Sequence, residues 1–180
     1  MALFYTGKGD KGLSHVGKKK YPKDSLILET LGELDELNSF LGLVRSTVKN
    51  KKLAADLETV QQHLFIIQAQ VAVVMFSEFK SPGLKKDKVV WLEHEIQAVE
   101  KRIKPERGFV VPGATTDAAW LDVARAIARR AERSVTAFHR KYPLPQEILP
   151  YLNRLSSYLY ALARSESARS KIKEQKPTYK

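Results

Sequence analysis

The chain has 180 residues, of which 43% are hydrophobic and 28% charged, and these values predict one soluble domain with a sizeable core. Cysteine is absent, which excludes disulfide bonds and thiolate metal sites and favours a reducing, cytoplasmic setting. The formal net charge of +11 suggests a polyanionic partner, but many lysines fall in expected loops and ends, where solvated charge is the ordinary explanation.

The N-terminal segment, residues 1–24, contains two glycine patterns and no convincing strand. It also lacks the apolar core of a signal peptide. GKGDKG at 7–12 matches the dinucleotide fingerprint letter for letter, and GLSHVGKK at 12–19 differs from a Walker A loop by one letter. Both folds need a strand before the glycines, so we reject them. The segment is then either a flexible tail or a loop whose backbone N–H groups bind an anion.

Five stretches with helical apolar spacing follow, separated by short breaks. They cover about residues 25–48, 52–79, 86–104 and 117–141, and a last stretch after the turn at 143–145. Asp24 or Ser25 is expected to cap the first helix and Thr116 the fourth. Pro150 fits only in the first turn of the fifth. Long helices with short connections predict an all-α fold, a five-helix antiparallel bundle.

The fourth expected helix carries the segment RAIARRAER at 125–133 on a stripe of small apolar residues. Arg125, Arg129 and Arg133 are spaced i, i+4 and i+8, so they form one row along the helix. Guanidinium groups bind phosphate through paired donors, which makes the row a candidate polyphosphate site. An equally weighted alternative is a set of ion pairs with acids such as Glu132 and Glu166.

A buried carboxylate is expected on the first helix. Asp35 lies beside the apolar stripe, where an unpaired charge would be costly. Arg125 has the same kind of position on the fourth helix, so we expect an ion pair between the two. The alternative is that both side chains extend to water.

The remaining titratable residues do not suggest a catalytic set. None of the four histidines completes a Glu-x-x-His ligand pair, which disfavours a di-iron bundle. His63, His94 and His139 are expected in the core or on the surface. Glu93 and Glu95 are expected on a solvated face.

Six segments match a known family in order and spacing. They are YTGKGDKGLS (5–14), PKD (22–24), LGELDELNSFLGLVR (31–45), FVVPG (109–113), ARAIARRAER (124–133) and YLNRLS (151–156). Through them the chain resembles the corrinoid adenosyltransferases of the propanediol-utilisation type over nearly its whole length. The resemblance implies a homotrimer with active sites between subunits, with residues 1–24 as a nucleotide-binding loop and 25–175 as the helical bundle of a single domain. It also implies transfer of the 5′-deoxyadenosyl group of ATP to the cobalt of reduced cobalamin, with release of triphosphate.

The resemblance assigns an ATP site to two groups of residues. The first group comes from the N-terminal segment and consists of Thr6, Gly7, Lys8, Gly9, Ser14, His15 and Lys23. The second comes from the helices and consists of Arg129, Arg130, Glu132, Arg133 and Asn153. Phe109 corresponds to the aromatic residue under the corrin ring, and the Asp35–Arg125 pair to an ion pair between subunits. Mg²⁺ would be held mainly by the ATP phosphates, with no metal site in the protein.

One departure from the family pattern bears on function. The family's Thr-(Arg/Lys)-Thr-Gly is Thr6-Gly7-Lys8-Gly9 here, so the basic residue is displaced by one position. A paralogue that binds ATP or a corrinoid without catalysis is therefore one alternative, and a basic helical module that binds nucleic acid is another. The main interpretation expects a reductase and an adenosylcobalamin-dependent enzyme as partners, and neither a membrane nor a nucleic acid.

Overall fold

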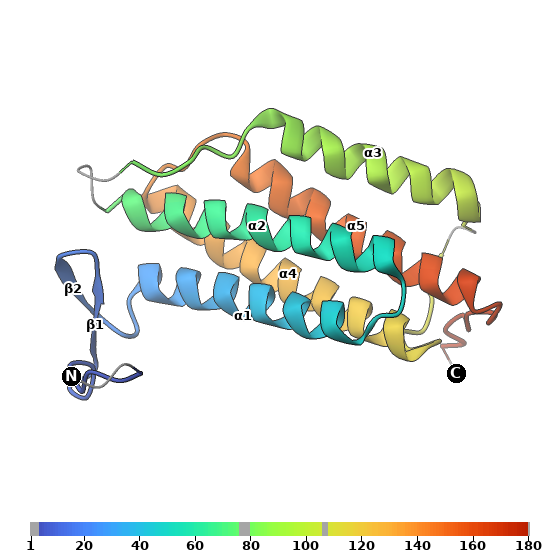
Figure 1. Ribbon diagram of the computed structural model, residues 1–180, viewed down its shortest axis with the longest axis horizontal. Helices are drawn as coiled ribbons and strands as arrows, with labels where there is room; N and C mark the ends of the chain where they lie inside the picture. Colours follow the sequence, from blue (N-terminus) through green and yellow to red (C-terminus); the bar gives the residue numbers. More distant parts are fainter. Residues whose placement is uncertain (1–3, 76–79, 106–107, 180) are drawn as a thin grey trace.

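The computed structural model describes residues 4–75, 80–105 and 108–179. Within these ranges, five long helices form a bundle in which consecutive helices run in opposite directions, with a two-stranded hairpin at one end (Figure 1). The elements are β1 (Leu13–Val16), β2 (Lys19–Pro22), α1 (Leu26–Thr47), α2 (Lys51–Val73), α3 (Lys86–Ile103), α4 (Thr116–Lys141) and α5 (Ile148–Arg169). The all-α, five-helix prediction is confirmed. No helix in the described residues combines the length and apolar character needed to cross a membrane.

The hairpin is a correction, because no strand was predicted from the sequence. β1 and β2 pair antiparallel, with Leu13 opposite Pro22 and Val16 opposite Lys19. The turn between them places Gly17 at φ +60°, the conformation that a glycine adopts at the first central position of a two-residue hairpin turn. A hairpin this short depends on its turn and not on an apolar alternation, so the pattern of its strands did not predict it.

The helix ends lie close to their predicted positions. Ser25 is the N-cap residue of α1, as expected, and Pro150 lies in the first turn of α5. The cap of α4 is Thr115 and not Thr116, because the Thr115 hydroxyl accepts a hydrogen bond from the backbone N–H of Ala118 at 3.1 Å. α2 ends at Val73, and the remainder of its predicted range includes residues 76–79, which lie outside the described residues.

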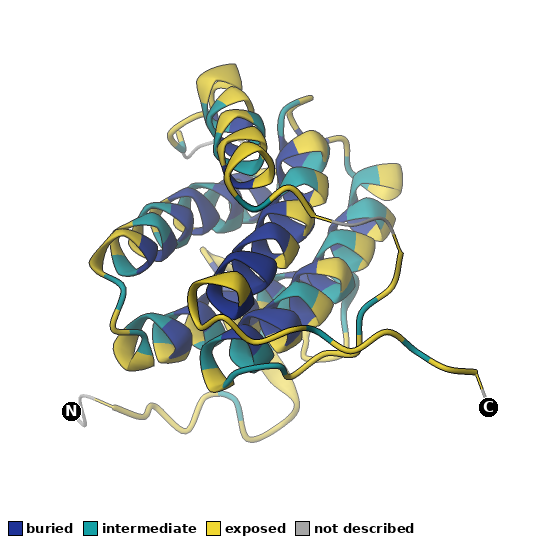
Figure 2. Cartoon of the chain, turned by 90° about the vertical axis from the view of Figure 1, so that its right-hand side faces the viewer, coloured by how far each residue is buried: buried dark blue, intermediate teal, exposed yellow. Residues whose placement is uncertain are grey.

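The core lies where the helices meet, with exposed residues on the outer surface (Figure 2). α4 packs against both α1 and α5, and α3 packs against α5. The small residues Ala124, Ala128 and Ala131 of α4 are fully buried, as predicted, which lets both neighbouring helices approach closely. α5 is the most enclosed of these helices, since its buried residues include the charged Arg164 and Glu166. The arrangement brings polar residues of α4 and α5 to the end of the bundle where α3 ends.

Candidate functional site

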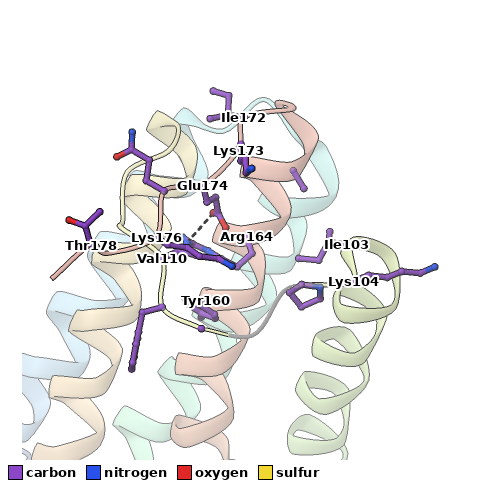
Figure 3. A pocket seen from close by; sticks show the side chains of 15 residues that line it. Ile103, Lys104, Val110, Tyr160, Arg164, Ile172, Lys173, Glu174, Lys176 and Thr178 are labelled. Carbon is purple, nitrogen blue, oxygen red and sulfur yellow. Dashed lines mark ion pairs between the residues drawn. The ribbon is translucent and has the colours of Figure 1, made fainter. Parts of the chain in front are cut away.

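Two neighbouring cavities open in the described part of the chain, at the end of the bundle where α3 ends and α4 begins. Their volumes are about 930 Å³ and about 500 Å³. The larger one lies between α5, the loop after α3 and the C-terminal tail (Figure 3). Both cavities are lined by Ile103, Pro105, Gly108, Phe109, Val110, Tyr160 and Arg164. These shared residues make the two cavities one site with two compartments.

Phe109 lies on the loop between α3 and α4 and lines both compartments. Its side chain is 77% exposed, although burying a phenylalanine is worth about 1.5–3 kcal/mol. Gly108 and Gly113 flank it with φ of 123° and 99°, a conformation that favours glycine. The fold therefore leaves an aromatic ring uncovered beside a cavity.

The arginine row predicted on the fourth helix is present. Arg125 and Arg129 both line the smaller compartment, and Arg129 and Arg133 are exposed. Arg125 stacks near Tyr160, with its Cζ atom 5.9 Å from the ring centroid, and its buried Nε has no hydrogen-bond partner. In the part of the chain that the structure describes, none of these three guanidinium groups pairs with a carboxylate. The ion-pair alternative is thus wrong for this row.

Arg130 differs from the row, because it turns toward α1. Its Nε donates to both carboxylate oxygens of Glu33, at 2.9 and 2.7 Å, and its Nη2 donates to Glu36. The hydrogen bond to Glu36, followed by that to Glu33, raises the pKa of Arg130 above its usual value. Arg130 therefore ties α4 to α1, and its acids are not the Glu132 and Glu166 that the sequence analysis named.

A series of hydrogen bonds connects α4 to α3 through residues of α5. Asn153 Nδ2 donates to Glu132 Oε1 at 2.9 Å, which brings two predicted site residues together. Arg154 Nη1 donates to Asn153 Oδ1 at 2.8 Å, and Arg154 Nε donates to Glu93 at 3.0 Å. These hydrogen bonds fix the orientation of the Asn153 amide next to the arginine row.

The predicted ion pair between Asp35 and Arg125 does not form within the described chain. Asp35 is exposed on α1, whereas its neighbours Leu34 and Leu37 are buried. Arg125 faces Tyr160 on α5 and not α1. Asp35 lies one position around the helix from the buried face, so the expectation of a pair inside one bundle was wrong.

The N-terminal group forms a local assembly of its own. The backbone N–H of Lys8 donates to Thr6 Oγ1 at 3.3 Å, and that of Lys23 donates to the carbonyl of Gly12 at 2.9 Å. The Lys23 side chain lies against Gly9, where an added Cβ would be 3.3 Å from Nζ. The other residues of this predicted group are Gly7, Ser14 and His15. Within the described residues, no hydrogen bond or ion pair joins this assembly to the arginines of α4.

Residues 4–166 match the family model described as cobalamin adenosyltransferase. The chain belongs to the cobalamin adenosyltransferase family. It is 39% identical to the corrinoid adenosyltransferase of Bacillus subtilis over 172 residues, which cover 93% of this chain and 88% of that protein. It is 36% identical to the corrinoid adenosyltransferase of Citrobacter freundii over 174 residues, which cover 92% of this chain and 96% of that protein. The resemblance inferred from the six sequence segments is confirmed.

Solved structures agree with this assignment. A variant of the PduO-type ATP:corrinoid adenosyltransferase from Lactobacillus reuteri, complexed with cobalamin and ATP, matches with a TM-score of 0.91 and 31% identity, covering 97% of this chain and 96% of that chain. A second variant of that enzyme, complexed with ATP, matches with a TM-score of 0.89 and 32% identity, covering 97% of this chain and 99% of that one. The bundle of this chain is therefore that of a PduO-type adenosyltransferase.

The site also contains one buried ion pair that was not predicted from the sequence. Arg164 Nη2 donates to Asp122 Oδ2 at 2.6 Å, and each side chain is only 5% exposed. The signal was present, because Asp122 directly follows the buried Leu121 on the apolar side of α4. The burial argument that was applied to Asp35 applies here. In the described residues, no cluster of three or more histidine, aspartate and glutamate side chains has the arrangement of a metal site.

Proposed function

We propose that this chain is an ATP:cob(I)alamin adenosyltransferase. The electron pair of Co(I) would attack C5′ of ATP, the Co–C5′ bond would form as the C5′–O bond breaks, and triphosphate would leave. The observation that carries this proposal is an arginine row that pairs with no carboxylate of the described residues and lies beside a cavity with an uncovered aromatic ring. A leaving triphosphate needs cationic donors, and the cobalt supplies the nucleophile, so no side chain has to act as one.

Arg129 and Arg133 would hold the phosphates of ATP. Both guanidinium groups are exposed and without a partner in the described chain, so their donors are available for bidentate hydrogen bonds to phosphate. Glu132 and Asn153 would add polar contacts, and Arg130 would contribute its charge while it stays on the carboxylates of α1. Mg²⁺ would be held mainly by the phosphates of ATP, and its charge would help to neutralise the departing triphosphate.

The N-terminal assembly would close the nucleotide site from a neighbouring subunit of a homotrimer. Within the described residues of one chain, no hydrogen bond or ion pair joins this assembly to the arginine row, and the hairpin that belongs to the assembly projects beyond the bundle (Figure 1). Among the described residues, Asp35 is exposed without a partner, and Arg125 has a buried Nε without a hydrogen-bond partner. An interface between subunits would satisfy both groups. In this proposal residues 1–24 are the nucleotide-binding loop, and 25–175 are the helical part of the same domain.

Phe109 would pack under the corrin ring. An apolar ring at that position excludes water and the lower axial ligand from the cobalt, which makes reduction to Co(I) easier. The 77% exposure of Phe109 supports this role, since a large ligand would cover the ring. A cytoplasmic reductase would then supply the electron, and an adenosylcobalamin-dependent enzyme would receive the product.

An anaerobic assay with ATP and chemically reduced cobalamin tests the proposal. The expected result is conversion of the cob(I)alamin absorption spectrum to that of adenosylcobalamin, with one triphosphate released for each product. Binding of ATP without any product would instead select the catalytically silent paralogue. Salt-dependent binding to duplex or single-stranded nucleic acid, without turnover, would select the nucleic-acid-binding module.

A further inference from the structure

Arg164 lies in the wall that the two compartments share. Its side chain is only 5% exposed, although it lines both compartments. Besides the short hydrogen bond to Asp122, the guanidinium lies over the ring of Tyr160, with Cζ 4.9 Å from the ring centroid. Asp122 and Tyr160 therefore hold the guanidinium in one orientation.

Part of this guanidinium has no hydrogen-bond partner in the described chain. Nε and Nη1 of Arg164 are buried and unsatisfied. Glu174 Oε1 lies 3.0 Å from Nη1 in an ion pair that makes no hydrogen bond, and this oxygen is itself buried with no donor among the described residues. The contact depends on charge alone. A buried, oriented arginine with unused donors at a cavity is a binding point for an acceptor group.

Glu174 belongs to the C-terminal tail, residues 170–179. Figure 3 shows its side chain reaching from the tail toward Arg164, with the tail along one side of the larger compartment. The backbone N–H of Val111 donates to the carbonyl of Gln175 at 2.8 Å, which joins the tail to the loop of Phe109. The tail thus covers the wall in which the free donors lie.

We propose that Arg164 is a docking point for a carbonyl oxygen on the rim of the corrinoid, and that Glu174 occupies this point while the site is empty. The inference rests on the proposed function, because it takes the cavity beside Phe109 as the corrinoid site. Corrinoids carry amide side chains around the ring, and amide carbonyl oxygens accept hydrogen bonds from guanidinium groups. Once Glu174 leaves, Asp122 balances the charge of Arg164, so the remaining pair is neutral and a neutral carbonyl is a suitable acceptor for its unsatisfied donors.

Glu174 and the corrinoid therefore compete for the same donors. In such a competition the apparent Kd equals the intrinsic Kd divided by the fraction of molecules in which the tail leaves the site open. Glu174→Gln keeps the shape of the side chain and removes its charge, so the Kd for cob(II)alamin should fall about fivefold. Arg164→Lys keeps a cation next to Asp122 and removes the planar donors, so the same Kd should rise about fivefold.

Anaerobic absorption titration with cob(II)alamin, in the presence of ATP, measures both effects. Glu29→Gln is the matched control, since it removes an exposed carboxylate in the first turn of α1, and it should leave the Kd unchanged. The affinity for ATP should be the same in all variants. Opposite shifts in the two variants support the docking point, because a purely structural ion pair would weaken binding in both.

Hydrogen exchange at the Val111 amide tests the tail without any corrinoid. Glu174→Gln should speed this exchange severalfold, since the tail that accepts the Val111 hydrogen bond is held less firmly. An unchanged or raised Kd for Glu174→Gln overturns the inference, as does an unchanged exchange rate at Val111. If the wild-type chain itself fails to bind cob(II)alamin, the proposed function fails as well, so the two failures are distinguishable.

Discussion

Arg129 and Arg130 are neighbours in the sequence, yet they lie on two different flanks of α4 and have different surroundings. On the flank toward α1, two carboxylates bind Arg130. On the flank toward the cavity, Arg125 and Arg129 have no carboxylate partner in the described chain. The role of each arginine therefore depends on the neighbouring helix. Where that helix supplies carboxylates, the arginine joins two helices, and where it supplies none, the guanidinium is available to a ligand.

The largest expected effect is on the cavity flank. Arg129→Ala should reduce the rate of adenosylcobalamin formation about 100-fold, because it removes a charged donor from the developing triphosphate. Circular dichroism should show unchanged helicity, since Arg129 is exposed. Arg140→Ala, at an exposed position in the last turn of the same helix, is the control. Equal turnover in both variants would remove Arg129 from the site.

Phe109→Ala should reduce turnover about tenfold by weakening the contact with the corrin ring. The KM for ATP should stay unchanged, because the phosphates lie on the arginine row. Val111→Ala serves as the control, since Val111 is an exposed residue of the same loop that does not line the two compartments. If Phe109→Ala instead lowers the melting temperature and leaves turnover intact, the ring anchors the loop and does not serve the corrinoid.

On the flank toward α1, the expected effect is on stability. Arg130→Ala leaves Glu33 and Glu36 without their shared cation, so the free energy of unfolding should fall by about 1 kcal/mol. Denaturant unfolding measures this change, which should shrink at high salt because the pair is partly exposed. Turnover should fall far less than in Arg129→Ala. An equal loss of turnover without loss of stability would contradict the contrast between the flanks.

The smallest effect is the change in stability between pH 7 and pH 6. It concerns a hydrogen-bonded histidine in the core. His63 is buried with its Nδ1 3.0 Å from the Tyr151 hydroxyl, and burial lowers its pKa from 6.5 to about 4. The unfolded chain then binds more protons than the folded one between these values, so stability is complete above pH 6.5 and is lost as the pH falls toward 4. Between pH 7 and pH 6 the loss should be under about 1 kcal/mol.

Urea unfolding at several pH values measures this slope, with His63→Asn as the test variant and His94→Asn, at an exposed histidine, as the control. The slope between pH 7 and pH 5 should flatten only in the His63 variant. A slope that persists there would assign the pH dependence to other groups.

The helices were predictable because their signals are local. Periodicity over a few turns places Ala124, Ala128 and Ala131 on one stripe, and the structure buries all three. The same periodicity aligns the arginine row. The hairpin at 13–22 was not predictable in this way, since its formation depends on a glycine turn and on one buried residue, Val16.

The pairing of charges was predicted poorly for a physical reason. Burial requires partners for a carboxylate on a core face, but periodicity does not say which helix supplies them. That reasoning selected Asp35, which is exposed, while the same reasoning fits Asp122, which is buried and bound to Arg164. An error of one position around a helix, about 100°, turns a side chain from the core to the solvent.

The sequence by itself therefore determined the five helices, their apolar faces and the row of cations on α4, because each follows from spacing along a single helix. Only the tertiary structure decided which of those cations are neutralised. That outcome depends on how α1 and α5 are rotated against α4, which brings Glu33 and Glu36 to Arg130 and leaves Arg129 beside an open cavity. Rotation between packed helices is set by the fit of all their side chains together, and no single stretch of sequence contains it.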